Sequence, residues 1–257
     1  MALSAQSYRK FRSFSEHSLP KNYHIAPRRP SKLDKPLSSP EPCILAPTTL
    51  IDVLRCAITD RTLFPGDESQ RQATLVRQAA LWAHRGLDLI QLREKDLSPT
   101  ELAPLASQIL ALIATASSPT RLLINAPSEA IVRVAAELGA PGVHLPSNAA
   151  TTPGQVRQLY AQAGQLAPVI TIACHSLGEV DRFSDHPVDA VLFAPVFKKV
   201  IEGKLITPGS GLRILHEACS IAAPTPVYAL GGVTEENAPQ CLAAGAKGIA
   251  GIRLFLG

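Results

Sequence analysis

The sequence predicts an α/β protein of the (β/α)8 TIM-barrel class in which the final helix is short or absent. Three observations support this class. From residue 52 onward, eight short apolar runs alternate with segments of helical periodicity, which indicates a parallel sheet that closes on itself. The chain is 46% hydrophobic but only 5% aromatic, as is typical of buried parallel strands packed against Ala- and Leu-rich helices. The last two apolar runs both meet glycines at their ends, where such barrels commonly hold a phosphate.

The expected strands follow from the apolar runs. They cover residues 53–59, 87–93, 121–125, 142–145, 169–173, 189–193, 226–230 and 246–252. An open doubly wound sheet is the alternative arrangement of the same elements. No GxGxxG motif follows the first strand, so a dinucleotide site has no support in the sequence.

The expected helices have start and stop signals. They cover residues 68–85, 98–116, 128–138, 152–163, a short stretch from 176, and 211–222, and one more opens at Thr234-Glu235-Glu236. Ser98 to Glu101 forms a capping box with proline at the first helical position, and Thr152-Pro153 is a similar start. Gly139 ends the helix before it. The chain stops at Gly257, which leaves no room for a full eighth helix, so the N-terminal extension or a partner chain in a homo-oligomer is expected to cover that part of the barrel wall.

Residues 1–50 are predicted to be a basic, Pro- and Ser-rich, disordered extension, and residues 51–257 the barrel domain. Residues 1–42 carry eight Lys or Arg and three Asp or Glu, a net charge of +5, whereas the whole chain has +4. The barrel is therefore close to neutral, which argues against nucleic-acid binding. An organelle transit peptide is the alternative for the extension, but its acidic residues and prolines favour an ordinary tail.

The cysteines and the apolar runs indicate the cellular compartment of the protein. Five cysteines are scattered without a CxxC pair, which indicates reduced thiols in a cytoplasmic protein and neither a disulfide framework nor a zinc site. No apolar run reaches the roughly 18 residues of a membrane span. We expect no membrane association.

Catalytic and binding groups of a barrel lie at the carboxyl ends of its strands. Candidates for contact with substrate are there: Gln91, Arg93, Lys95, Asn125, Ser147 and Lys199. Gln91 and Arg93 point to the same side of their strand, and the Arg-Glu-Lys sequence offers donors for a phosphate or carboxylate or, alternatively, a surface ion-pair cluster.

His175 is the candidate general acid/base, because it directly follows a strand and imidazole exchanges protons near neutral pH. A structural histidine that caps the next helix is the alternative. His144 lies inside a strand and is interpreted as a packed core residue. Cys174 lacks an orienting partner and is not expected to be a nucleophile.

The candidate phosphate site consists of Gly231, Gly232, Ala250 and Gly251. Glycine allows close approach of the backbone, and the free amides of a following helix point at the bound anion. The sequence Leu230-Gly231-Gly232-Val233-Thr234 therefore predicts a strand, a glycine turn and a helix N-terminus around a phosphate.

Several motifs, in order and at matching spacings from about residue 54 to the end, resemble the thiamine-phosphate synthase/TenI family. They are Gln91-Leu92-Arg93-Glu94-Lys95, Leu122-Leu123-Ile124-Asn125, Gly142-Val143-His144-Leu145, His175-Ser176-Leu177, Val191-Leu192-Phe193-Ala194-Pro195-Val196-Phe197 and Ala229-Leu230-Gly231-Gly232-Val233-Thr234. The resemblance implies a role in thiamine biosynthesis and a small phosphorylated thiazole as substrate.

The family has two branches. The synthase joins a pyrimidine pyrophosphate to a thiazole phosphate and needs Mg²⁺, and two aspartates of its motifs are metal ligands. Ala126 and Ala149 occupy those places here, and alanine cannot ligate Mg²⁺. Leu145-Pro146-Ser147 and His175-Ser176-Leu177 are more similar to the TenI branch, which is associated with a thiazole tautomerase.

The resemblance therefore implies a metal-independent thiazole tautomerase that acts on a carboxythiazole phosphate and needs no cofactor. Moving a proton between two positions of a ring requires one acid/base group, His175, and a phosphate anchor. Two alternatives stay open: a Mg²⁺-dependent thiamine-phosphate synthase, in which Glu94 and Asp96 replace the missing ligands, and a non-catalytic protein that binds a thiazole or thiamine phosphate.

Overall fold

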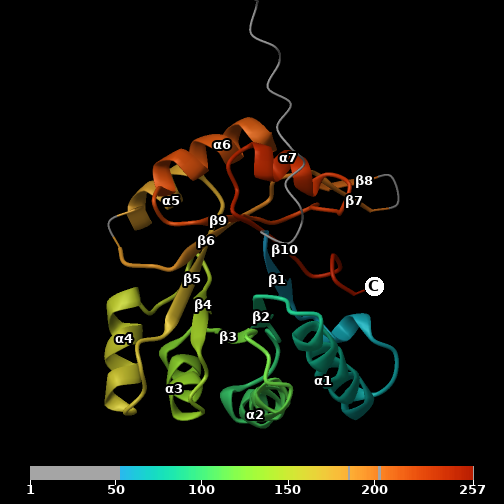
Figure 1. Ribbon diagram of the computed structural model, residues 1–257, viewed down its shortest axis with the longest axis vertical. Helices are drawn as coiled ribbons and strands as arrows, with labels where there is room; N and C mark the ends of the chain where they lie inside the picture. The colour runs from blue at the N-terminus through green and yellow to red at the C-terminus, as the bar shows by residue number, and fades with distance from the viewer. Residues whose placement is uncertain (1–52, 185, 202–203, 257) are drawn as a thin grey trace, which may run out of the picture. The chain divides into compact units, whose positions relative to one another are not determined.

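The computed structural model describes residues 53–184, 186–201 and 204–256, so the predicted extension of residues 1–50 lies outside the described residues. Eight parallel strands close into a barrel in the order β1-β10-β9-β6-β5-β4-β3-β2 (Figure 1). The strands are β1 (Leu54–Ile58), β2 (Leu89–Leu92), β3 (Arg121–Asn125), β4 (Gly142–Leu145), β5 (Val169–Cys174), β6 (Ala190–Phe193), β9 (Val227–Ala229) and β10 (Gly248–Gly251). The predicted TIM-barrel class is confirmed.

The helices connect successive strands. They are α1 (Glu68–His84), α2 (Pro99–Thr115), α3 (Glu129–Glu137), α4 (Pro153–Gln162), α5 (Leu177–Ser184), α6 (Gly211–Ala222) and α7 (Ala238–Ala243), with a short 3-10 helix, η2 (Arg61–Leu63), after β1. The capping box predicted at Ser98 is present, and Thr152 forms another with Gln155. These reciprocal bonds satisfy amides at the start of each helix, which explains why the starts could be located from the sequence.

Two apolar clusters make up the core. The larger one fills the space between strands and helices and includes Trp82, Ile90 and Phe193. The smaller one lies inside the barrel and includes Cys56, Leu123 and Tyr228. A side chain at Gly248 would place its Cβ 2.7 Å from the Tyr228 ring, so this glycine makes room for the aromatic ring inside the barrel.

The chain after β10 forms no helix within the described residues, as predicted. Instead, Leu254, Phe255 and Leu256 pack against the larger cluster. The indole Nε1 of Trp82 on α1 donates a hydrogen bond of 2.7 Å to the carbonyl oxygen of Phe255. The last residues of the chain therefore contribute to the wall that an eighth helix would otherwise cover.

Two segments differ from the sequence prediction. The region predicted as a loop at 198–211 contains an antiparallel pair of strands outside the barrel, β7 (Lys199–Ile201) and β8 (Lys204–Thr207). The last helix begins at Ala238, four residues later than Thr234. Asn237 accounts for the delay, because its Oδ1 accepts the Thr234 amide and its Nδ2 donates to the Gly232 carbonyl oxygen, which closes a turn before the helix.

Among the described residues, no helix has the length and apolar character needed to cross a membrane.

Candidate functional site

A cavity of about 450 Å³ opens at the carboxyl ends of the barrel strands. We call it the mouth cavity. Its walls are formed by Ile58, Gln91, Arg93, Lys95, Asn125, Pro127, His144, Pro146, Asn148, Ala173, His175 and Leu230. Five of the predicted site residues therefore come together here: Gln91, Arg93, Lys95, Asn125 and His175. This is the end of a barrel at which substrates bind.

Gln91 carries an acceptor that the described residues leave unused. Its side chain is 2% exposed, and its Nε2 donates to Asn125 Oδ1 at 3.3 Å. Gln91 Oε1 is buried and has no hydrogen-bond partner within the described residues. Because buried polar atoms in folded proteins nearly always have a partner, this oxygen is suited to accept a hydrogen bond from a ligand.

His175 is fixed at the mouth by its neighbours. Its Nδ1 lies 2.8 Å from the Ala194 carbonyl oxygen, which can only accept, so Nδ1 carries the proton. Its backbone amide donates to Glu179 Oε2 at 2.6 Å. The ring thus does not cap α5, and in the neutral imidazole Nε2 has a free lone pair. This is the arrangement that a general base requires.

His144 also lines the mouth cavity, although the sequence analysis interpreted it as a core residue. It is 4% exposed, and its Nδ1 lies 2.9 Å from Thr171 Oγ1 on the neighbouring strand. Burial, then the charges of Arg93 and His175, lower the pKa of His144 to about 3. His144 lies opposite Asn125 in the parallel register of β3 and β4, which brings it to the cavity.

The lowered pKa of His144 predicts a dependence of stability on pH. Between pH 6.5 and 3 the unfolded chain protonates this imidazole and the folded chain does not, so the free energy of unfolding falls as the pH falls through this range. In His144→Gln this contribution is absent. We expect chemical denaturation curves of the variant to lose less stability between pH 6.5 and 4.5 than those of the wild type, and equal slopes would contradict the prediction.

Arg93 and Lys95 are held by an ion cluster behind the cavity wall. Arg61 bonds to Glu94 at 2.9 Å, Asp96 at 2.7 Å and Glu68 at 2.6 Å. The Thr59 hydroxyl donates to Glu94 Oε1 at 2.5 Å and accepts the Arg93 amide at 2.8 Å.

Hydrogen bonds from Arg61 lower the pKa of Asp96 to about 2, and hydrogen bonds to Asp96, Glu68 and Glu94 raise that of Arg61. The carboxylate of the Arg-Glu-Lys motif thus belongs to an ion cluster that is largely buried at Glu94, while Arg93 and Lys95 line the cavity.

The loop after β9 presents free backbone amides. Gly231 and Gly232 both have positive φ, of 89° and 69°. Within the described part of the chain, the amides of Gly231, Gly232 and Val233 donate no hydrogen bond, whereas that of Thr234 bonds to Asn237. Consecutive free amides in such a turn form a concave anion site. The free amides here belong to the loop, and no first helical turn directly follows the glycines as expected, because α7 starts only at Ala238.

This amide loop is tied to His175. The Val196 amide donates to Leu230 at 2.9 Å, and the Phe197 amide donates to Gly231 at 2.9 Å. Ala194, which accepts from His175, belongs to the same segment after β6. Leu230, directly before the glycines, lines the same cavity as His175. The imidazole and the amide loop thus belong to neighbouring parts of the barrel mouth.

Other predicted site residues lie elsewhere. Ala250 is 0% exposed and packs inside the barrel opposite Cys56, so its side chain is not at the mouth. Gly251 is buried at the end of β10, and the amides of Ile252 and Arg253 that follow have no partner within the described residues.

Ser147 lies beside Pro146 and Asn148 but does not line the cavity. Lys199 starts β7, and its side chain lies outside what the structure describes.

The residues of the mouth do not fit a protein-bound Mg²⁺ ion. Ala126 is fully buried, Ala149 is partly buried, and none of the described residues lines the cavity with a carboxylate. Glu94 and Asp96, the substitutes considered above, are both bonded to Arg61. The described residues contain no group of three or more His, Cys, Asp or Glu side chains that could hold a metal ion. Mg²⁺ in proteins is bound mainly through carboxylates and substrate phosphates, so we derive no step through a metal.

Comparisons with known proteins agree with the family resemblance of the sequence motifs. The family model described as thiamine monophosphate synthase matches residues 56–255. A relative from Aquifex aeolicus, named putative thiamine-phosphate synthase 2, is 34% identical over 67% of this chain and 84% of its own. One from Geobacter sulfurreducens, named putative thiamine-phosphate synthase, is 34% identical over 78% of this chain and 85% of its own.

A solved structure supports the fold. The thiamine phosphate pyrophosphorylase from Pyrococcus furiosus matches with a TM-score of 0.60 and 22% identity over 79% of this chain and 86% of its own. At that identity the likeness shows the barrel fold alone. The family model and the relatives together establish that the chain belongs to the thiamine monophosphate synthase family.

Proposed function

We propose that this member of the family is a metal-independent thiazole tautomerase that acts on a carboxythiazole phosphate. The observation that carries the proposal is the composition of the mouth cavity, which presents an oriented imidazole and no carboxylate. A proton transfer needs an acid/base group such as the imidazole, and it does not need a carboxylate that holds a metal ion. Anchoring the substrate phosphate on the amides of Gly231 to Val233 would keep the ring within reach of His175.

The proposed reaction uses one base. His175 Nε2 removes a proton from one carbon of the conjugated ring system, and the electron pair of that C–H bond moves into the π system. The imidazolium then returns the proton to the second carbon, which leaves the aromatic thiazole. The Ala194 carbonyl oxygen stabilises the transient imidazolium by accepting from Nδ1 throughout. Arg93 or Lys95 binds the carboxylate of the substrate.

A Mg²⁺-dependent thiamine-phosphate synthase is the second candidate, and two observations favour it. The relatives at 31–34% identity carry that name. Gln91 Oε1 is a buried acceptor without a partner in the described residues, and an amino group of a pyrimidine would satisfy it better than a carboxylate would. The names of the relatives thus favour the transferase, and the residues at the positions of the metal ligands favour the tautomerase.

One assay separates the two activities. The purified full chain is incubated with pyrimidine pyrophosphate and thiazole phosphate, with Mg²⁺ or with EDTA, and pyrophosphate release is measured. In parallel it is incubated with carboxythiazole phosphate alone. We expect no pyrophosphate release under either condition and conversion of the carboxythiazole in EDTA. Mg²⁺-dependent pyrophosphate release would establish the second candidate, and the absence of both activities with retained phosphate binding would leave a non-catalytic binding protein.

We also propose that the chain forms a homo-oligomer. Light scattering of the purified chain tests this, and a monomeric mass would contradict it.

A further inference from the structure

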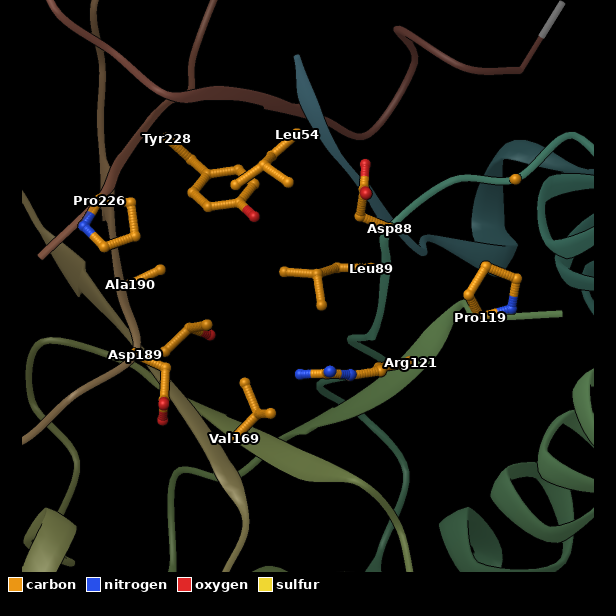
Figure 2. A pocket seen from close by; sticks show the side chains of 12 residues that line it. Leu54, Asp88, Leu89, Pro119, Arg121, Val169, Asp189, Ala190, Pro226 and Tyr228 are labelled. Carbon is orange, nitrogen blue, oxygen red and sulfur yellow. The ribbon is translucent and has the colours of Figure 1, made fainter. Parts of the chain in front are cut away.

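A second cavity lies at the opposite end of the barrel, at the amino ends of the strands. We call it the floor cavity. It has a volume of about 360 Å³ and is lined by Leu54, Gly86, Asp88, Leu89, Pro119, Arg121, Val169, Thr171, Asp189, Ala190, Pro226 and Tyr228. Figure 2 shows these side chains around an open centre. The mouth cavity shares none of them.

Two hydrogen-bond donors in the floor cavity have no partner in the part of the chain that the structure describes. The Arg121 guanidinium makes no ion pair and no hydrogen bond with any described residue, and Figure 2 shows it extended from β3 into the cavity. The Tyr228 hydroxyl also has no hydrogen bond within the described residues and points into the same space. Tyr228 is 3% exposed, so its hydroxyl depends on a ligand or on water in the cavity for a partner.

The carboxylates of the floor cavity have other roles. Asp88 Oδ2 accepts the Arg55 amide at 2.8 Å, and Asp189 Oδ2 accepts the Ile170 amide at 2.7 Å. Neither forms an ion pair with Arg121. In Figure 2 both carboxylates are directed away from the Arg121 guanidinium. They fix the starts of β1 and β5, and they leave the guanidinium available.

The rest of the wall restricts the ligand. Leu54, Leu89, Val169, Ala190 and Pro226 give the cavity an apolar surface. The Thr171 hydroxyl is already bonded to His144 Nδ1 at 2.9 Å. Because both carboxylates are directed away from it, the single Arg121 guanidinium can balance one negative charge of a ligand, and a second charge would stay unbalanced. An apolar body with a single negative group fits these walls, whereas inorganic phosphate does not.

We propose that the floor cavity is a binding site for a small organic acid with an apolar body, whose carboxylate meets Arg121 and Tyr228. A guanidinium binds a carboxylate through two parallel hydrogen bonds, and the tyrosine hydroxyl supplies a third. The site is separate from the mouth cavity, so it does not depend on which reaction the mouth carries out.

The test uses the full chain and saturation-transfer NMR with 4-methylpentanoate, phenylacetate and L-leucine as probes. The primary amides of the three acids and inorganic phosphate serve as comparison ligands. We expect at least one acid to bind at millimolar concentration or below, and its amide and phosphate to bind at least about tenfold more weakly. No binding by any of the three acids, or equal binding by acid and amide, would overturn the proposal.

Three variants locate the bound acid. Arg121→Gln removes the charge and is expected to weaken acid binding at least about tenfold. Ala190→Leu fills the cavity without changing a charge and is expected to abolish binding, so it tests the site even if Arg121→Gln fails to fold. Arg93→Gln at the mouth is the matched control and should leave the affinity for the acid unchanged. Loss of binding in the control, or retained binding in the folded Ala190→Leu protein, would assign the acid to another site.

Discussion

His175→Gln is expected to lower turnover of the thiazole substrate by about 100- to 10,000-fold, the usual contribution of a general acid/base group. In the wild type, the imidazole Nδ1 donates a hydrogen bond of 2.8 Å to the Ala194 carbonyl oxygen. Glutamine can still donate a hydrogen bond to this oxygen. It cannot take up a proton. Because the phosphate is expected to bind the amides of Gly231 to Val233, KM should change far less than kcat.

The matched control for this variant is His216→Gln on α6. His216 is exposed, and its Nδ1 bonds to the Ala244 carbonyl oxygen much as His175 bonds to that of Ala194. His216 lies outside the mouth cavity, so the turnover of the His216→Gln protein should equal that of the wild type. A His175→Gln protein with wild-type kcat would remove this imidazole from the mechanism.

Arg61→Met is expected to lower the free energy of unfolding by about 3–5 kcal/mol, the usual cost of removing one partner of a buried ion pair. The side chains of Arg61 and Glu94 are 5% and 2% exposed, so methionine would leave the Glu94 carboxylate buried without its counter-charge. Glu94 also accepts from Thr59, which in turn holds the Arg93 amide. Urea denaturation measures the loss of stability.

Arg133→Met is the control for Arg61→Met. Arg133 pairs with Glu129 on the surface of α3, with both side chains more than half exposed. Such pairs contribute about 0–1 kcal/mol, so the control should unfold close to the wild type. Equal effects of the two substitutions would show that the Arg61 cluster does not stabilise the barrel as a buried ion pair should.

The strand and helix positions could be predicted because local signals agreed with the tertiary structure. Alternating apolar and helical segments located the eight barrel strands, and capping boxes located the starts of α2 and α4. The start of α7 could not be predicted from Thr234-Glu235-Glu236, because the Asn237 side chain competes for the Thr234 amide. The β7–β8 pair was missed because its short strands lie outside the barrel, and β8 lacks the buried apolar pattern of the barrel strands.

The candidate site was predicted in part. Five residues, Gln91, Arg93, Lys95, Asn125 and His175, were found because they lie at or just after the carboxyl ends of strands, and these ends meet at the barrel mouth. His144 was interpreted as core because it lies within a strand, and burial alone does not reveal that a cavity opens next to it. The residues of the floor cavity form no recognisable sequence motif, so the cavity could not be predicted from the sequence.

Two features of the site depend on contacts that sequence spacing does not contain. Arg61, which fixes the Arg93 and Lys95 segment, lies more than thirty residues from its partners Glu94 and Asp96. Ala250 was expected to offer its backbone amide to a phosphate, and the structure adds that its side chain packs in the cluster inside the barrel with Cys56. Both follow from how the strands align in space.

Proton NMR of carboxythiazole phosphate incubated with the wild-type chain in D₂O and excess EDTA tests the proposed reaction most directly. The predicted result is conversion to the aromatic carboxythiazole at a rate that is unchanged when Mg²⁺ replaces EDTA. A spectrum that stays unchanged in EDTA, with conversion only in the presence of Mg²⁺, would contradict a metal-free transfer of the proton by His175.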